Sequence, residues 1–328
     1  MERKVIIFLL GLFCSIELSA QVFNFDEPLA HTFSIVARDP QTGEMGVAVQ
    51  SHWFSVGSIV AWGEAGVGVI ATQSFVNPSF GQNGLELLKK GMTAQEVVDN
   101  LIADDEGRDV RQLAIVDSKG NSASYTGSKC IDEAGNIVGD NYSVQANMML
   151  NNAVWGAMSK AFEHSTGPLA ERLITALEAA QNEGGDIRGK QSACLLVVRG
   201  TPTGNIWEDR LIDLRVEDNP NPITELKRLL KVHRAYDHMN AGDLAVEKND
   251  IKLAMDEYNT AMKMFPENLE MKYWTAVSLA NTGDVEKSLP MFKEIFAKDK
   301  NWKELTKRLV PVGLLTVSDE ILKNILAQ

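Results

Sequence analysis

The sequence predicts an α+β domain followed by an all-α domain, and three observations lead to this prediction. Strand patterns and helix patterns occur in alternating groups over residues 32–222, which is typical of a layered domain whose helices pack on sheet faces. After the polar, turn-rich segment 218–222 ("DNPNP") only helix patterns follow, so we expect the second domain to cover 223–328. A chain of 328 residues is long enough for two domains that each bury a core.

The strands of the first domain are predicted from apolar or alternating patterns that lie between turn residues. The earliest two flank the turn segment "DPQTG" and therefore form a hairpin. A later hairpin, "RQLAIVDSKGNSASYTG", closes on "KGN". The predicted strands lie at 32–37, 45–51, 58–62 and 66–74, in two arms within 111–127, within 184–200, and at 210–218.

Four helices are predicted between these strands. The first, in "NPSFGQNGLELLKKG", stops at Gly91. The second begins after Thr93, which completes a capping box with Glu96. A helical pattern then covers 152–181 and is interrupted near 167–168 by Gly-Pro, so it predicts two helices.

A repeat is visible in the helical region. The segments "NDIKLAMDEYNTAMKMFPEN" and "GDVEKSLPMFKEIFAKDKNW" align with an offset of 34 residues, with small residues where helices touch and an aromatic residue four positions later. This pattern resembles the tetratricopeptide repeat (TPR), and the resemblance covers about 100 residues. It implies a groove that binds a protein partner. The alternative is a set of helices that only pack. The aligned pairs are Asn249 with Gly283, Asp250 with Asp284, Ala254 with Ser288, Tyr258 with Phe292, and Ala261 with Ile295.

The first twenty residues have the plan of a secretory signal peptide. A charged head at 2–4 precedes an apolar run at 5–13, and small Ala20 ends the segment. The apolar run is shorter than the roughly 20 residues that span a bilayer, so we expect no stable membrane span. The predicted protein is exported, either periplasmic or secreted, with 21–31 as a propeptide or linker before the first domain.

Composition excludes some partners and leaves other questions open. The formal net charge of −12 argues against nucleic-acid binding, which needs clustered Lys and Arg. Two of the three cysteines, Cys130 and Cys194, follow the signal peptide, and in an exported protein they either pair or remain small buried hydrophobes. No motif indicates a metal or an organic cofactor, so none is expected. The oligomeric state is left open.

Thr32 is the residue that suggests chemistry. A threonine hydroxyl is a poor nucleophile near neutral pH unless a base lies beside it, and a residue's own α-amine can be that base once the preceding chain is removed. The α-amine has a pKa of about 7.7 to 8, so part of it is unprotonated near neutrality. A domain that starts with a strand on Thr32, after a removable segment, fits this requirement. The alternative is a β-branched residue that simply opens a strand.

Five segments are informative when they are taken together in chain order: "TFSIVARDPQTGEMGVAVQS", "GVGVIATQSFVNPSFGQNGLELLKKGMTAQE", "RQLAIVDSKGNSASYTG", residues 141–150, and "GPLAERLITALEAAQNEGGDIRGKQSACLLVVR". Together they resemble the DUF1028 family, which is assigned to the N-terminal-nucleophile (Ntn) hydrolase superfamily. The resemblance spans about 32–222 and implies a four-layer αββα sandwich with Thr32 as nucleophile and its α-amine as base. It implies no substrate, although some members are fused to peptidoglycan-binding modules, an association that points to cell-wall peptides.

Other side chains are candidates for the same site. Donors that stabilise a developing oxyanion are expected from Asn147, Gln73 and Ser74. Groups that orient the substrate or the amine are expected from Asp186, Arg188, Gln191 and Ser192. The alternatives are amides that satisfy turn backbone and a surface ion pair. The sequence thus predicts an exported amidohydrolase that cleaves an amide or peptide substrate, or else a noncatalytic binding or adaptor protein that uses its TPR-like helices.

Overall fold

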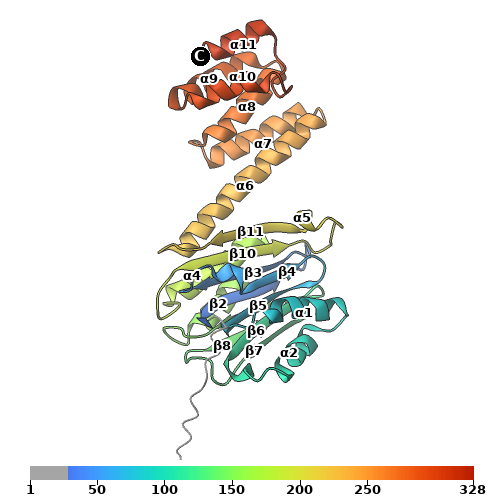
Figure 1. Ribbon diagram of the computed structural model, residues 1–328, viewed down its shortest axis with the longest axis vertical. Helices are drawn as coiled ribbons and strands as arrows, with labels where there is room; N and C mark the ends of the chain where they lie inside the picture. The colour runs from blue at the N-terminus through green and yellow to red at the C-terminus, as the bar shows by residue number, and fades with distance from the viewer. Residues whose placement is uncertain (1–28) are drawn as a thin grey trace, which may run out of the picture.

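The computed structural model describes residues 29–328, so the predicted signal peptide and most of 21–31 lie outside the described residues. The molecule is elongated, with strands and helices gathered at one end and helices alone at the other (Figure 1). The mixed α+β architecture and the C-terminal helical region that the sequence predicts are both confirmed. Among the described residues, no helix is long and apolar enough to cross a membrane.

One sheet has six antiparallel strands in the order β11-β10-β3-β2-β9-β8. The predicted hairpin at the start of the domain is confirmed, because β2 and β3 pair with Thr32 opposite Ser51. The hairpin formed by β8 and β9 was not predicted. The strands are β2 (Thr32–Arg38), β3 (Met45–Ser51), β8 (Gly135–Gly139), β9 (Tyr142–Ala146), β10 (Ser192–Val198) and β11 (Arg210–Val216).

A second sheet follows the order β1-β5-β6-β7, and β4 also pairs with β5. The predicted strand at 58–62 was wrong in its first half. Ser58 ends a 3-10 turn, η1 (Val56–Ser58), and β4 begins only at Ala61; Ser55, which precedes this turn, adopts a left-handed conformation with φ 58°. The strands are β1 (Leu29–Ala30), β4 (Ala61–Glu64), β5 (Gly68–Phe75), β6 (Arg111–Asp117) and β7 (Ser122–Thr126).

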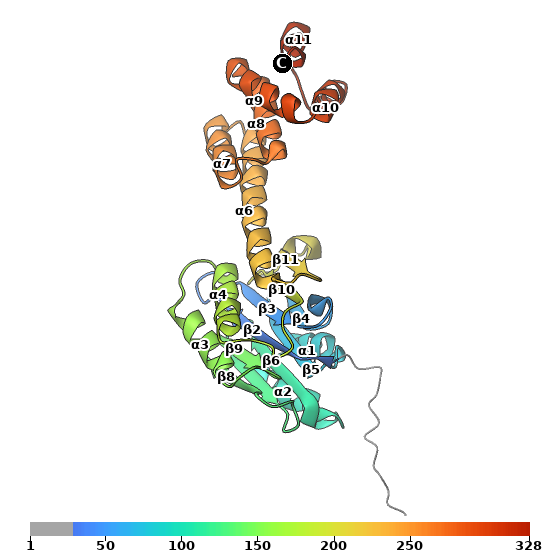
Figure 2. The same cartoon turned by 90° about the vertical axis from the view of Figure 1, so that its left-hand side faces the viewer.

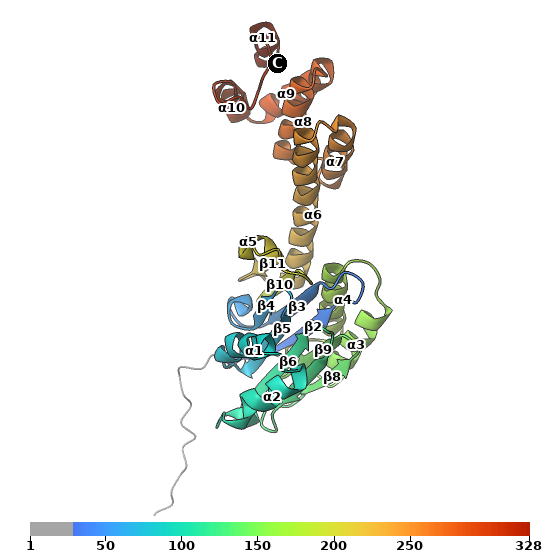
Figure 3. The ribbon, with the colours of Figure 1, turned by 90° about the vertical axis from the view of Figure 1, so that its right-hand side faces the viewer.

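The two sheets pack face to face, and helices cover their outer faces (Figures 2 and 3). Apolar side chains of both sheets meet in a buried core that includes Val36, Val47, Val69 and Val116. Helices α1 and α2 cover the five-stranded sheet, and α3 and α4 cover the six-stranded sheet. The central strands β2, β3, β5, β6 and β10 are therefore buried on both faces, which explains their largely apolar sequences. The helices are α1 (Ser79–Lys89), α2 (Ala94–Ala103), α3 (Val154–His164) and α4 (Leu169–Asn182).

The long helix α6 (Pro222–Glu247) leads from the sheets to the helical region. It follows the short helix α5 (Ile206–Asp209) and β11 in the chain. The first turns of α6 bury Leu226 and Leu230 in the core beside the six-stranded sheet. Farther along, the guanidinium of Arg234 donates to both carboxylate oxygens of Glu171 on α4, at 3.0 and 3.1 Å. The helix is thus attached to the layered part by apolar packing and by a two-point ion pair.

The helical region repeats with the spacing that the sequence indicates. Helices α7 and α9 have 14 residues each and begin 34 positions apart. Gly242 on α6 faces the ring of Tyr258 on α7, and a Cβ at position 242 would lie 2.3 Å from a ring carbon, so only glycine fits. The hydroxyl of Tyr258 donates to Asp243 at 2.6 Å. The helices are α7 (Ile251–Met264), α8 (Leu269–Asn281), α9 (Val285–Lys298), α10 (Asn301–Leu309) and α11 (Asp319–Leu326).

The buried ring of Tyr258 is expected to hold α6 and α7 together. Tyr258→Ala should lower the free energy of unfolding by about 3–5 kcal/mol, because it removes a fully packed ring. Tyr258→Phe keeps the ring and loses one hydrogen bond, so it should cost about 1 kcal/mol. Urea unfolding followed by far-ultraviolet circular dichroism measures both losses, and equal losses for the two variants would contradict this account of the packing.

Candidate active site

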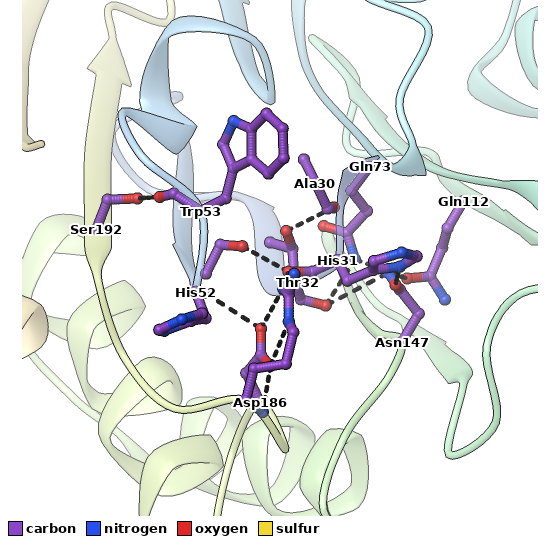
Figure 4. Close-up of polar contacts among 12 residues, drawn as sticks. Ala30, His31, Thr32, His52, Trp53, Gln73, Gln112, Asn147, Asp186 and Ser192 are labelled. Atoms are coloured by element: carbon purple, nitrogen blue, oxygen red, sulfur yellow. Dashed lines mark hydrogen bonds and ion pairs between the residues drawn. The ribbon is translucent and has the colours of Figure 1, made fainter. Parts of the chain in front are cut away.

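Thr32 begins β2 and is completely buried. The residues before it continue into the structure, since β1 pairs with β5 through Ala30 opposite Ser74. The His31–Thr32 peptide bond therefore lies inside the molecule, where side chains from both sheets and from the loop before β10 converge on it (Figure 4). Buried backbone groups need hydrogen-bond partners, and the partners found here define the site.

Two side-chain donors hold the carbonyl oxygen of His31. The Ser51 hydroxyl donates to it at 2.5 Å, and Nη2 of Arg188 donates to it at 2.8 Å. Asp186 orients Arg188 by accepting from its Nε at 3.0 Å and from its Nη2 at 2.7 Å. The carboxylate of Asp186 is completely buried and also accepts from the backbone N–H of His52 at 3.1 Å. One neutral and one cationic donor thus converge on a single carbonyl oxygen, an arrangement that stabilises negative charge developing there.

The hydroxyl and the carbonyl of Thr32 are held separately. Oγ1 donates to the carbonyl oxygen of Ala30 at 2.7 Å, which keeps the hydroxyl beside the peptide bond that precedes it. The carbonyl oxygen of Thr32 accepts from Nε2 of Gln73 at 3.2 Å and from the backbone N–H of Asn147 at 3.1 Å. Both ends of the residue are therefore fixed by hydrogen bonds.

The imidazole of His31 is buried and neutral. Asn147 donates its Nδ2 to Oε1 of Gln112 at 2.8 Å, so its Oδ1 is an acceptor for Nδ1 of His31, which lies 2.8 Å away. The ring also stands edge-on to Phe75, with 5.5 Å between centroids. Burial lowers the pKa of His31, the bond to Asn147 opposes this, and the guanidinium of Arg188 lowers it further. Nδ1 therefore carries the proton of a neutral ring.

A chain of uncharged side chains continues from this point between the two sheets. Gln73 donates to Oε1 of Gln112 at 2.6 Å and accepts from Ser34 at 2.6 Å. Gln145 donates to the same Ser34 hydroxyl at 2.5 Å. Because these amides satisfy one another, they tolerate complete burial without an ionised group.

The structure brings four of the seven auxiliary candidates to Thr32. Asp186 and Arg188 act at the His31 carbonyl, and Asn147 and Gln73 contact His31 or the Thr32 carbonyl. Gln73 does not hold the His31 carbonyl, because its amide protons go to the Thr32 carbonyl and to Gln112.

The other three candidates make backbone hydrogen bonds near the site or hold a neighbouring loop in place. Ser74 pairs with Ala30 through its backbone and has φ 74°. Gln191 donates its backbone N–H to the carbonyl of Ser51. The hydroxyl of Ser192 donates to the carbonyl of Trp53 and accepts from the N–H of Val56, so it fixes the loop after β3.

Sequence reasoning missed His31, Ser51 and Gln112. A signal for Ser51 was available, because the register of the predicted hairpin already places it opposite Thr32. No comparable signal identified His31 or Gln112, since each reaches the site through contacts with residues distant in the chain.

The sequence left open whether Cys130 and Cys194 form a disulfide. Cys130 and Cys194 are both free thiols and buried. Burial raises the pKa of the Cys194 thiol to about 12, so the thiol stays protonated near neutral pH. Within residues 29–328, no group of three or more His, Cys, Asp or Glu side chains is placed to hold a metal ion.

Comparison with known proteins identifies the family. Residues 32–226 match the model of a family of unknown function, DUF1028, and the chain belongs to this family. Among solved structures, a DUF1028 protein from Silicibacter pomeroyi is similar, with 34% sequence identity and a TM-score of 0.56. The similarity covers 62% of this chain and 85% of that protein. No curated protein matches.

The neutral, buried imidazole predicts a pH dependence of stability. The pKa of His31 is lowered in the folded chain, so the unfolded chain, with a pKa of about 6.5, takes up the proton first. The stabilisation is therefore present above about pH 6.5 and is lost as the pH falls from there toward the lowered value. Urea unfolding of a chain that carries Thr32→Ala and retains residues 29–31 should show this loss. The double variant Thr32→Ala/His31→Gln should lose less stability over the same pH range. Equal slopes of the unfolding free energy against pH in the two variants would contradict the prediction.

Proposed function

We propose that this protein is an Ntn-type amidohydrolase in which Thr32 becomes the N-terminal nucleophile after the His31–Thr32 bond is cut. The observation that carries this proposal is the buried carbonyl of His31, held by Ser51 and Arg188 directly beside a threonine hydroxyl. Preorganised donors aimed at a carbonyl oxygen, here one neutral and one cationic, stabilise the negative charge that develops on that oxygen during acyl transfer. The face-to-face sheets with helices on both sides support the assignment to the Ntn superfamily.

The same geometry supports cleavage by the chain itself. Oγ1 of Thr32 attacks the carbonyl carbon of His31, and the negative charge forms on the oxygen that Ser51 and Arg188 hold. The C–N bond then breaks, and the hydroxyl proton is transferred in net terms to the Thr32 nitrogen, leaving an ester between His31 and Oγ1. Water hydrolyses this ester, which releases the leader with a free carboxylate and leaves Thr32 with a free α-amine.

Substrate turnover would use the free α-amine that the cleavage creates on Thr32. The α-amine of Thr32, with a pKa of about 7.7 to 8, accepts the proton from Oγ1, and the hydroxyl attacks an amide carbonyl bound where the His31 carbonyl lay. Ser51 and Arg188 would stabilise the oxyanion, and Gln73 would hold the Thr32 carbonyl in place. This chemistry needs neither a metal nor an organic cofactor. With the predicted signal peptide, it fits an exported enzyme, periplasmic or secreted, that acts on peptide amides such as those of the cell wall.

A second role is proposed for the helical region. The 34-residue spacing of α7 and α9 and the close contact between Gly242 and Tyr258 support a TPR-like arrangement that binds a protein partner. If the protein acts only as an adaptor, partner binding will require these helices and will be unaffected by Thr32→Ala. A partner is first isolated by its binding to the intact protein. Isothermal titration calorimetry then measures the binding of that partner to the Thr32→Ala variant and to a variant without these helices, which distinguishes this role from catalysis.

Cleavage before Thr32 is the first expected outcome. Intact mass and N-terminal sequencing of the exported protein should give a chain that begins at Thr32. Thr32→Ala should abolish the cut because the attacking hydroxyl is gone, and Thr32→Ser should retain it because the hydroxyl remains. A Thr32→Ala chain that is processed normally would exclude self-cleavage.

Arg188 tests the proposed oxyanion contact. Arg188→Met should slow cleavage about 10²- to 10³-fold, the usual effect of removing one such donor. Arg188→Lys keeps a positive charge beside the buried Asp186, so it is the variant to measure if Arg188→Met does not fold. Arg215→Met is the matched control, because Arg215 forms an ion pair with Asp213 on β11 and makes no contact with the His31 carbonyl. Cleavage at the parental rate in folded Arg188→Met and Arg188→Lys chains would refute the role of Arg188.

A further inference from the structure

The residues before Thr32 bind to the protein in the manner of a peptide ligand. Leu29 and Ala30 form an antiparallel pair with Phe75 and Ser74 at the edge of the five-stranded sheet. An extended segment added to a sheet edge is a common mode of peptide recognition, in which backbone bonds give affinity and side-chain pockets give specificity.

The side chains of Ala30 and His31 are enclosed. Ala30 is completely buried and belongs to the apolar core between the sheets. His31 is only 2% exposed, with its ring edge-on to Phe75 and its Nδ1 bonded to Oδ1 of Asn147. The first position admits a small side chain, and the second admits a flat ring that donates a hydrogen bond.

We propose that Ala30 and His31 lie, before cleavage, in the place that becomes the substrate-binding site of the mature enzyme. The site takes peptides whose scissile bond follows a neutral, hydrogen-bond-donating side chain, histidine in particular, with a small residue before it. This inference rests on the proposed function, and it names the substrate class of that same site.

Loss of the leader leaves polar groups that such a substrate would satisfy. Oδ1 of Asn147 loses its donor, and the Ser51 hydroxyl loses its acceptor. Buried polar atoms without a partner cost about 1–3 kcal/mol each, so a ligand that restores these bonds is favoured over one that cannot. A cationic side chain is disfavoured chiefly because the position is almost completely buried; the guanidinium of Arg188 adds to this effect, and the Asp186 carboxylate opposes it.

The first test compares fluorogenic peptides on the mature chain. Acetyl-Leu-Ala-His-aminomethylcoumarin should have a kcat/KM about 10- to 100-fold higher than the matched Phe peptide, since Phe fills the site without donating to Asn147. Asn147→Leu should reduce this preference to less than about threefold, since it removes the acceptor. Equal kcat/KM for the His and Phe peptides on the parent enzyme would overturn the inference and leave the proposed hydrolase in place.

The second test separates binding from catalysis. Acetyl-Leu-Ala-His with a free carboxylate is the product that cleavage would leave, so it should bind a 32–328 chain that carries Thr32→Ala, as measured by calorimetry. The matched Phe peptide should bind about 10-fold or more weakly. Binding of the His peptide without turnover by the parent enzyme would refute the catalytic proposal but support the site. Equal binding of the two peptides, or no binding of either to a chain with a native circular dichroism spectrum, would overturn the inference.

Discussion

The rest of the site depends on one constraint, which is the burial of the His31–Thr32 peptide bond between two sheets. A buried carbonyl must be satisfied, and here Ser51 from β3 and Arg188 from the loop before β10 provide the donors. Arg188 can donate to this carbonyl because the completely buried carboxylate of Asp186 compensates its charge and orients its planar guanidinium group. The loop before β10 and the end of β3 are therefore both held in place by the peptide bond that they enclose.

The layers around this bond are built to keep it dry and neutral. The apolar core between the sheets ends at a group of glutamines and serines whose amides and hydroxyls satisfy one another. An ionised group at those positions would need its own counter-charge, whereas amides can donate and accept in the same chain. The neutral imidazole of His31 belongs to this environment, and the ion pair of Asp186 and Arg188 lies at its border.

Much of the layered part could be predicted from local pattern. The β2–β3 hairpin, the capping box at Thr93 and the break between α3 and α4 all follow from residues adjacent in the chain. The β8–β9 hairpin was missed because both strands are short and β8 begins and ends with glycine. The start of β4 was misplaced because the left-handed backbone at Ser55 depends on packing against β10, where Gly57 lies against Cys194.

The sequence by itself determined most of the order of strands and helices, with the β8–β9 hairpin as an exception. It also determined the membership in DUF1028, the 34-residue spacing of α7 and α9, and the choice of Thr32 as the candidate nucleophile. These features are carried by periodicity and short-range turn chemistry, which one stretch of chain contains in full. Only the tertiary structure decided which groups meet at Thr32. Arg188 lies 157 positions from His31, and Asn147 lies 116 positions from it, so their contacts with His31 arise from the stacking of the sheets. A hydrogen bond between distant residues leaves no periodic trace in the sequence, and for that reason the role of His31 became visible only in the folded chain.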